Sequence, residues 1–117
     1  MKFRDLAPEI CRQRLIIEGE SHQPLTKEEM HDFLVDLSED LDMEPFYGPV
    51  SSYSEKYGWC AFMHWVTSGV HMYFWEDRNP CFFSIDIYTC KPFDEEDAVN
   101  CVRKFFGSRL VDVVWKE

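Results

Sequence analysis

The residues of this sequence that could carry out chemistry lie mostly between positions 58 and 90. His64 and His71 stand close to Cys60, and imidazole and thiolate groups are the ligands that zinc prefers. Their spacing matches no standard zinc motif, however, and histidines on half-buried strands are more often hydrogen-bonded core residues. Metal binding by these three residues is therefore a remote alternative.

Three further residues in the same stretch could bind or react with a ligand. Cys90 ends an apolar strand, where a thiol could be reactive, although cysteine is also among the most commonly buried residue types. Asp86 lies in an apolar strand and is either a ligand-binding carboxylate or a group that faces solvent or a basic partner. Ser68, followed by glycine, is typical of a turn. These residues alone predict no more than an α+β domain.

Three consecutive strands must position these residues. Ranges 58–67 and 70–75 are rich in aromatic and apolar residues, and the two residues between them, Ser68 and Gly69, suit a hairpin turn. A loop and a third strand at 81–90 follow.

Pairing of Thr67 with Val70 would place His64 opposite Tyr73 and Phe62 opposite Trp75. Alternation then assigns one face of the hairpin to the following residues: Cys60, Phe62, His64, Val66, His71, Tyr73 and Trp75. Ser68 stands at the end of that face. The other face is also largely apolar, so both should be covered, one by helices and the second by another subunit.

The rest of the chain supplies two helices and three strands. Thr26 and Glu29 form a capping box that predicts a helix running to about Leu41. Asp94 can cap a second helix that ends near Gly107. The further strands are expected at 12–20, 44–50 and 109–115, with a polar loop at 51–57. This order predicts a two-layer α+β sandwich, a mostly antiparallel sheet with two helices on one face.

Composition limits the classes of function. The 117 residues suit one domain, 1–117, and the net charge of −10 argues against a nucleic-acid partner. Five cysteines without a C-x-x-C pair indicate a reduced, cytoplasmic protein. We expect no signal peptide and no membrane span.

Segment 84–90, SIDIYTC, at the end of a strand and followed by a turn and a helix, resembles the V-D-V-F-T-C-like segment of bacterial and archaeal S-adenosylmethionine decarboxylases. Their upstream stretch is similar to E-S-H-x-S-I-H-T-W-P-E. Anchoring on Trp75 aligns 67–75, TSGVHMYFW, with it without gaps, and two extra residues then precede Cys90. The order of strands and helices also fits the family, so the resemblance covers nearly the whole chain.

The resemblance implies a specific chemistry. Family members cleave their own backbone before a serine and convert it to a pyruvoyl group, whose carbonyl forms a Schiff base with the substrate amine and withdraws electrons during decarboxylation. Ser68 falls on the pyruvoyl-forming serine. Cys90 falls on the catalytic cysteine, a proton donor.

Several positions depart from the family pattern. Thr67 stands where a glutamate usually precedes the serine, Tyr73 where a histidine assists processing, and Cys60 where a second serine assists. Tyrosine has a much higher pKa than histidine and is a poorer proton shuttle near neutral pH. Trp-Pro-Glu becomes 75–77, Trp-Glu-Asp.

We therefore expect a divergent, homodimeric member of the family that is not efficiently self-processed and has an S-adenosylmethionine-binding or amine-binding role. The alternative is an active pyruvoyl-dependent decarboxylase, acting on S-adenosylmethionine or another amino acid, in polyamine (spermidine) biosynthesis. The candidate catalytic residues are Ser68, Cys90, Tyr73, Cys60 and His71. The candidate substrate-binding residues are Phe62, Trp75 and Asp86.

Overall fold

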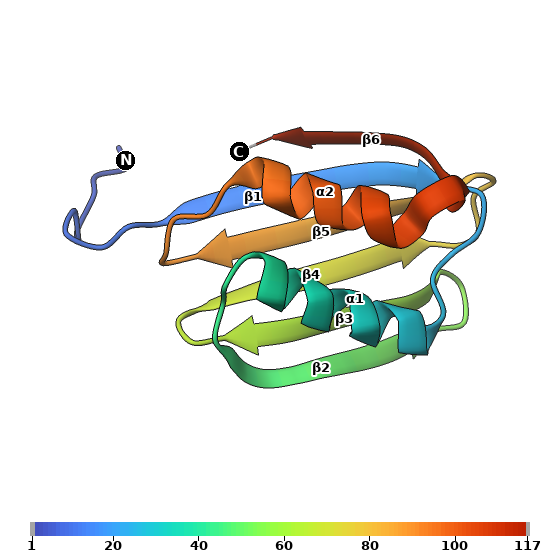
Figure 1. The fold of residues 1–117 in the computed structure, drawn as a ribbon, viewed down its shortest axis with the longest axis horizontal. Coiled ribbons are helices and arrows are strands. Elements are labelled where there is room, and N and C mark those ends of the chain that lie inside the picture. Colours follow the sequence, from blue (N-terminus) through green and yellow to red (C-terminus); the bar gives the residue numbers. More distant parts are fainter. Residues whose placement is uncertain (1, 117) are drawn as a thin grey trace.

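Six strands form one antiparallel sheet in the computed structural model, which describes residues 2–116 (Figure 1). The strands are β1 (Gln13–Ser21), β2 (Pro45–Ser54), β3 (Gly58–Trp65), β4 (Ser68–Trp75), β5 (Cys81–Thr89) and β6 (Leu110–Lys116). Their order across the sheet is β2-β3-β4-β5-β1-β6. The helices are α1 (Lys27–Asp40) and α2 (Glu95–Phe106), and a short 3-10 helix, η1 (Gly107–Arg109), follows α2.

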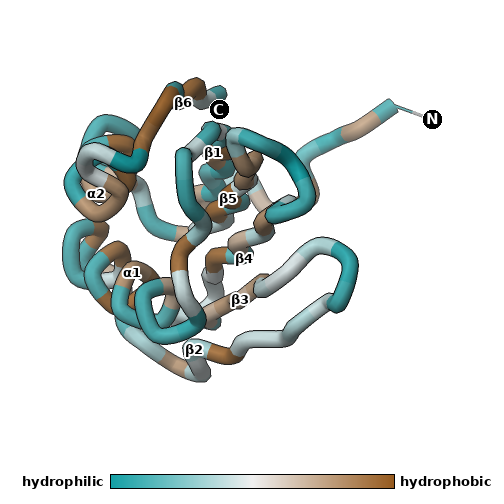
Figure 2. The backbone as a smooth tube through the Cα atoms, turned by 90° about the vertical axis from the view of Figure 1, so that its right-hand side faces the viewer, coloured by the Kyte–Doolittle hydropathy of each residue, from teal (hydrophilic) through white to brown (hydrophobic). Residues whose placement is uncertain are grey.

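Both helices begin and end where their capping residues predict. Thr26 accepts a hydrogen bond from the Glu29 amide, and the Glu29 carboxylate accepts one from the Thr26 amide, which completes the capping box. The Asp94 carboxylate caps α2 by accepting a hydrogen bond from the Glu96 amide, and Gly107 ends the helix with a positive φ of 57°. The helices lie on the same face of the sheet (Figure 2). The predicted two-layer α+β arrangement is confirmed.

The core lies between the sheet and the two helices. Alternate residues of the strands point toward the helices and are fully buried, among them Leu15, Ile17, Met72, Ile85 and Ile87. The ring of Phe83 on β5 stacks on that of Phe106 on α2 at 4.5 Å. The Ser38 hydroxyl on α1 accepts a hydrogen bond from the Trp65 indole at 2.7 Å and donates one to the Leu34 carbonyl. This bond lets a large indole be buried without losing its polar partner.

The β3–β4 hairpin has a different register from the one that the sequence predicts. Trp65 pairs with Ser68, His64 with Gly69 and Cys60 with Tyr73, so the two turn residues are 66–67. Each residue of β3 thus has its partner four positions earlier than expected. Because this shift is even, the paired residues of β3 and β4 keep their predicted faces. Ser68 is the exception, because it pairs with the buried Trp65 and so belongs to the helix-facing side of β4 rather than to the end of the open face. Hydrophobic alternation could not distinguish the two registers, since both bury the same side chains.

Strand β2 is longer than predicted. It extends through 51–54, which were expected to be loop, because this polar segment pairs with residues 58–61 of β3. As the edge strand, β2 can carry polar residues while its backbone still completes the ladder.

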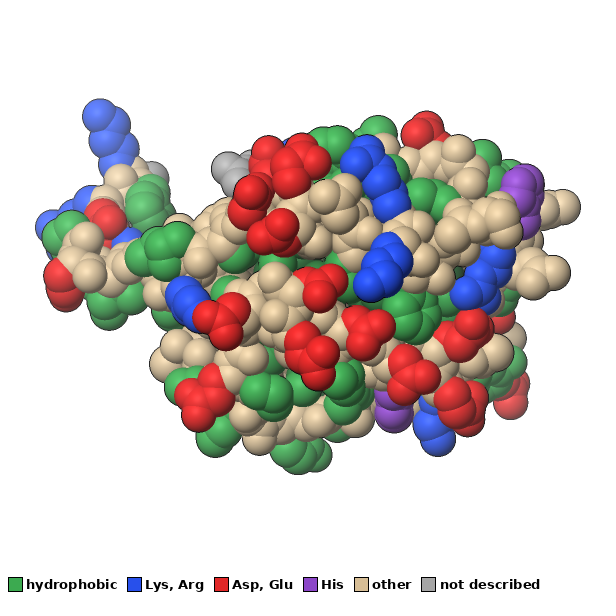
Figure 3. Space-filling view, viewed as in Figure 1, with side chains coloured by type: hydrophobic (Ala, Val, Ile, Leu, Met, Phe, Trp, Pro, Cys, Tyr) green, Lys and Arg blue, Asp and Glu red, His purple; other side chains and the backbone are tan. Residues whose placement is uncertain are grey.

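The face of the sheet away from the helices is open. It carries an aromatic row that includes Tyr47, Phe62, His71, Tyr73 and Tyr88, and Tyr73 and Tyr88 keep 42% and 45% of their surface exposed. The helix layer instead presents many acidic side chains to solvent (Figure 3). No helix within residues 2–116 has the length and apolar character needed to cross a membrane.

Candidate functional site

Ser68 and Cys90 meet at one end of the sheet. The β3–β4 turn brings Ser68 beside the end of β5, and the Cys90 amide donates a hydrogen bond to the Ser68 hydroxyl oxygen at 3.0 Å. The Cys90 thiol donates to the Thr67 carbonyl oxygen, also at 3.0 Å. Cys90, which is far from the hairpin turn in the sequence, thus contacts the residues on both sides of the Thr67–Ser68 peptide bond.

Thr67 has a strained backbone. Its φ of 57° lies in the left-handed region, which costs a β-branched residue roughly 1–2 kcal/mol. Its hydroxyl donates to the Val66 carbonyl at 2.6 Å. The residue before the candidate serine therefore carries local strain, and the turn and the Cys90 contact hold it in place.

A shallow cavity of about 460 Å³ opens beside Ser68. Its lining comes from the ends of β1, β3, β4 and β5 and from the turn: Arg14, His64, Thr67, Ser68, Gly69, His71, Asp86 and Tyr88. This volume suits a small molecule of nucleoside or amino-acid size.

Arg14 and Asp86 form the charged part of this lining. The guanidinium makes two hydrogen bonds to the carboxylate, Nε to Oδ1 at 3.0 Å and Nη2 to Oδ2 at 2.6 Å. The carboxylate raises the pKa of Arg14, so the guanidinium is charged at neutral pH. Asp86 is thus balanced by a basic neighbour of the same chain. A zwitterionic ligand would find a donor and an acceptor side by side.

Aromatic rings continue from the cavity along the open face. His71 stacks on Phe62 with 5.6 Å between ring centroids, and Tyr73 lies parallel to His71 at 6.4 Å. Such a row offers flat surfaces to a base or to a cation. Phe62 therefore lies beside the cavity, because its ring stacks on His71, which is one of the lining residues.

Three of the candidate residues lie away from Ser68 within one chain. Tyr73 is five residues further along β4, which corresponds to roughly 16 Å at about 3.3 Å per residue. Cys60 pairs with Tyr73 and is equally distant. Trp75 packs against Phe82 at the opposite end of the open face, with 5.1 Å between the ring centroids.

The remote zinc hypothesis is not supported. Within residues 2–116, no group of three or more His, Cys, Asp or Glu side chains is arranged to hold a metal ion. Phe62 lies between Cys60 and His64 on β3, and its ring stacks on that of His71 on β4. Apolar contact therefore replaces the ligand geometry that zinc would require.

Arg14 is the site residue that sequence reasoning missed. It is a polar position on the strand that begins the chain's sheet, and it reaches Asp86 because β1 pairs with β5. The alternation of polar and apolar residues places Arg14 on the solvent side of its strand. Which strand lies beside β1, however, depends on the order of strands in the sheet, and the sequence did not predict that order.

The fold and site define an α+β protein with a serine directly after a hairpin turn and a cysteine after the end of the next strand. The model of the family described as S-adenosylmethionine decarboxylase matches residues 15–115. The chain belongs to this family. A search of curated proteins found no match.

Proposed function

We propose that this S-adenosylmethionine decarboxylase-like protein binds S-adenosylmethionine or a related amine beside Ser68 and keeps Ser68 as an ordinary serine. The observation that carries the proposal is the chemistry of the groups at the processing positions, where a phenol and a thiol stand in place of a histidine and a serine. Tyr73 and Cys60 lie roughly 16 Å from Ser68 along the strand, and the Ser68 hydroxyl oxygen is held by the Cys90 amide. A tyrosine is also a weak base near neutral pH.

Intact-mass spectrometry of freshly purified protein tests the state of Ser68. We expect a single species with the mass of the uncleaved chain. Two fragments separated at Thr67–Ser68, the second with a pyruvoyl end, would overturn the proposal. Ser68→Ala provides the uncleavable reference.

The second candidate function is an active pyruvoyl-dependent decarboxylase. The observation that favours it is the Cys90 thiol, which donates to the Thr67 carbonyl oxygen at 3.0 Å. Attack of the Ser68 hydroxyl on that carbonyl carbon would place negative charge on this oxygen, and a donor there stabilises it. The strain at Thr67 would also be relieved when its peptide bond breaks. A pyruvoyl group formed here would supply the electron-withdrawing carbonyl for decarboxylation.

The proposed ligand binding does not depend on whether Ser68 stays a serine or is converted to a pyruvoyl group. The cavity combines the Arg14–Asp86 pair with the rings of His71 and Tyr88. Calorimetric titration with S-adenosylmethionine, its decarboxylated form and spermidine tests it. We expect binding by at least one of them that survives Ser68→Ala and is lost in Asp86→Asn. Asp32→Asn, an exposed change on α1, is the matched control. No heat and no thermal shift at millimolar ligand would contradict the proposal.

We also propose that two copies pair through their open faces with the helices outside. The open face exposes aromatic side chains, whereas the helix layer is acidic and would repel a second copy of itself (Figure 3). Sedimentation at micromolar concentration should show a dimer. Monomer alone would contradict this assembly.

A further inference from the structure

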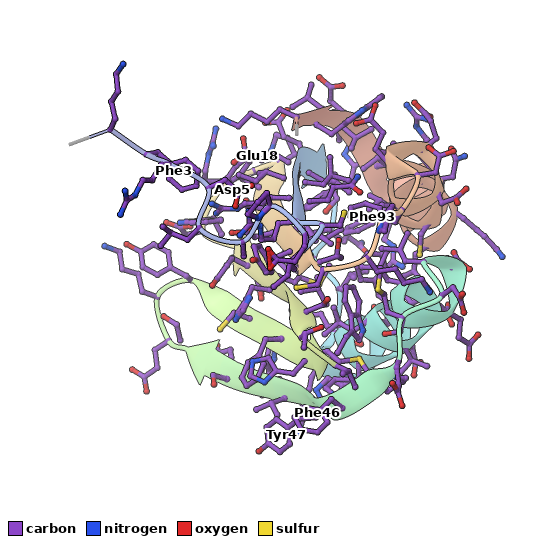
Figure 4. All side chains as sticks on the ribbon, turned by 90° about the vertical axis from the view of Figure 1, so that its left-hand side faces the viewer. Phe3, Asp5, Glu18, Phe46, Tyr47 and Phe93 are labelled. Carbon is purple, nitrogen blue, oxygen red and sulfur yellow. The ribbon has the colours of Figure 1, made fainter. Side chains whose placement is uncertain are left out.

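The N-terminal arm, residues 2–12, exposes large apolar side chains that contact little of the chain. Phe3 keeps 92% of its surface exposed, Leu6 80% and Ile10 47%. The arm leaves the body at the beginning of β1 and projects on the side of the open face, as two views from opposite sides show (Figures 2 and 4). Exposed apolar residues on a projecting segment are characteristic of a partner contact.

The arm has a defined direction. Asp5 pairs with Arg12 and also accepts a hydrogen bond from the Ala7 amide, and the Ile10 amide bonds to the Ala7 carbonyl. The Arg12 guanidinium lowers the pKa of Asp5, so this ion pair is present at neutral pH. Residues 5–12 thus form a closed loop, and residues 2–4 start from the end of the sheet where β1 begins.

A second cavity lies at the opposite end of the open face. It has a volume of about 240 Å³, and both apolar and acidic side chains line it. Phe82 and Val114 are the apolar residues used below, Glu18, Glu20 and Asp112 are the acidic ones, and Arg78 lies over the Phe82 ring. Val114 keeps 58% of its surface exposed.

Residues 2–4 cannot reach this cavity in their own chain. Glu18 is six residues beyond Arg12 along an extended strand, which corresponds to roughly 20 Å. From Asp5, residues 2–4 span at most about 10 Å. The cavity is therefore out of reach unless the Asp5–Arg12 pair breaks.

A second copy can supply the contact. When two open faces meet with their strands antiparallel, the beginning of β1 in one copy lies over the far end of β1 in the other. Charge favours this orientation, because Lys2, Arg4 and Arg12 outnumber Asp5 and Glu9 in the arm, while three carboxylates line the cavity.

We propose that the arm of each copy docks on the other copy's second cavity, with Phe3 against Phe82 and Val114 and with Lys2 and Arg4 beside Glu18, Glu20 and Asp112. This inference rests on the face-to-face dimer proposed above. It adds which segment clamps the dimer and which way the two sheets run.

A photo-crosslinker tests the contact directly. Benzoylphenylalanine replaces Phe3, and equal amounts of ¹⁵N-labelled and unlabelled chains are mixed until subunits exchange, irradiated and digested. We expect crosslinks from the arm to residues 78–82 or 110–116 in which the two peptides carry different isotopes. Crosslinks between peptides of the same isotope alone, or to other surfaces, would overturn the proposal.

Charge reversal gives an independent measurement. Arg4→Glu and Asp112→Lys should each raise the dimer dissociation constant about tenfold, and the double variant should recover most of the loss. Asp32→Lys on α1 changes the charge by the same amount outside the contact and should leave the constant unchanged. All three changes are at exposed residues, and circular dichroism checks that the fold is kept.

The outcomes separate this inference from the proposed function. If arm variants leave an existing dimer unchanged, the arm contact is wrong, and ligand binding by the wild-type protein is unaffected. If the wild-type protein is monomeric, the arm contact and the dimer fail together, while calorimetry still decides ligand binding.

Discussion

The two faces of the sheet are built from similar residues but differ in burial. Neighbours on β5 show it best, because Phe83 is fully buried against Phe106 while Phe82, on the open face, is only half-buried. The helices cover one face and leave the aromatic row of the other exposed (Figure 2). Apolar content in a strand therefore indicates that a cover is needed, but it does not show whether the same chain provides it.

Substitution of the two neighbouring phenylalanines measures this difference most strongly. Phe83→Ala should lower the free energy of unfolding by about 3–5 kcal/mol, because it leaves a cavity between β5 and α2. Phe82→Ala should cost about 1 kcal/mol at concentrations where the protein is monomeric. Urea unfolding followed by circular dichroism gives both values. Equal losses would mean that the open face is as well packed as the core.

Two serines extend the comparison to polar groups. Ser38→Ala should cost about 1–3 kcal/mol, since it leaves the buried Trp65 indole without its acceptor. Ser84 is on the open face, where its hydroxyl makes a 3.4 Å contact with Glu18, and Ser84→Ala should change stability by less than about 0.5 kcal/mol. Chemical denaturation at pH 7 checks both. A larger loss at Ser84 would contradict the assignment of the faces.

The ion pair at the start of α1 gives a pH-dependent contribution. Arg109 and then the Thr26 amide lower the pKa of Glu29, so its stabilisation is complete above the ordinary carboxylate pKa and is lost as the pH falls through the lowered value. Glu29→Gln should cost roughly 0.5–1 kcal/mol at pH 7, because the pair is partly exposed. The stability of the Glu29→Gln variant should also fall less steeply than that of the wild-type protein below about pH 4.5. Thermal melts from pH 3 to 7 measure this, and parallel curves for both proteins would refute it.

Thiol reactivity reports the smallest difference between the faces. Burial, followed by the nearby Asp40, raises the pKa of Cys101 in the helix layer, so this thiol should react slowest with iodoacetamide at pH 8. Exposed Cys11 should react first, with Cys60 and Cys90 between them. If the open faces meet, the labelling of Cys60 should slow as protein concentration rises. Mass spectrometry of digests resolves each site, and rapid labelling of Cys101 would show that the helix layer opens.

Local signals predicted the helices correctly, because a capping box and an apolar stripe depend on residues a few positions apart. The hairpin register was wrong for a physical reason. Ser-Gly is a favoured turn pair, but here Thr67 takes the positive φ and Ser68 joins the ladder, where it bonds to Cys90. That contact joins residues 22 positions apart, and no pattern within the hairpin indicates it.

The candidate site could be predicted in part. The family motif identified Ser68 and Cys90, and the structure brings them together. The structure also shows that Tyr73 and Cys60 pair with each other far from Ser68, because Tyr73 is five residues further along an extended strand. Arg14 could not be assigned to the site before β1 was known to lie beside β5.

Strand β2 has a consequence for how far association can proceed. Two irregularities break its register with β3, and Pro45 and Pro49 have no N–H to offer a further strand. Continuous growth of sheets edge to edge needs two usable edges in every copy, and this edge is poorly suited to the task. Association should therefore stop at a closed, finite particle, and concentrated solutions of the folded protein should resist the formation of fibres.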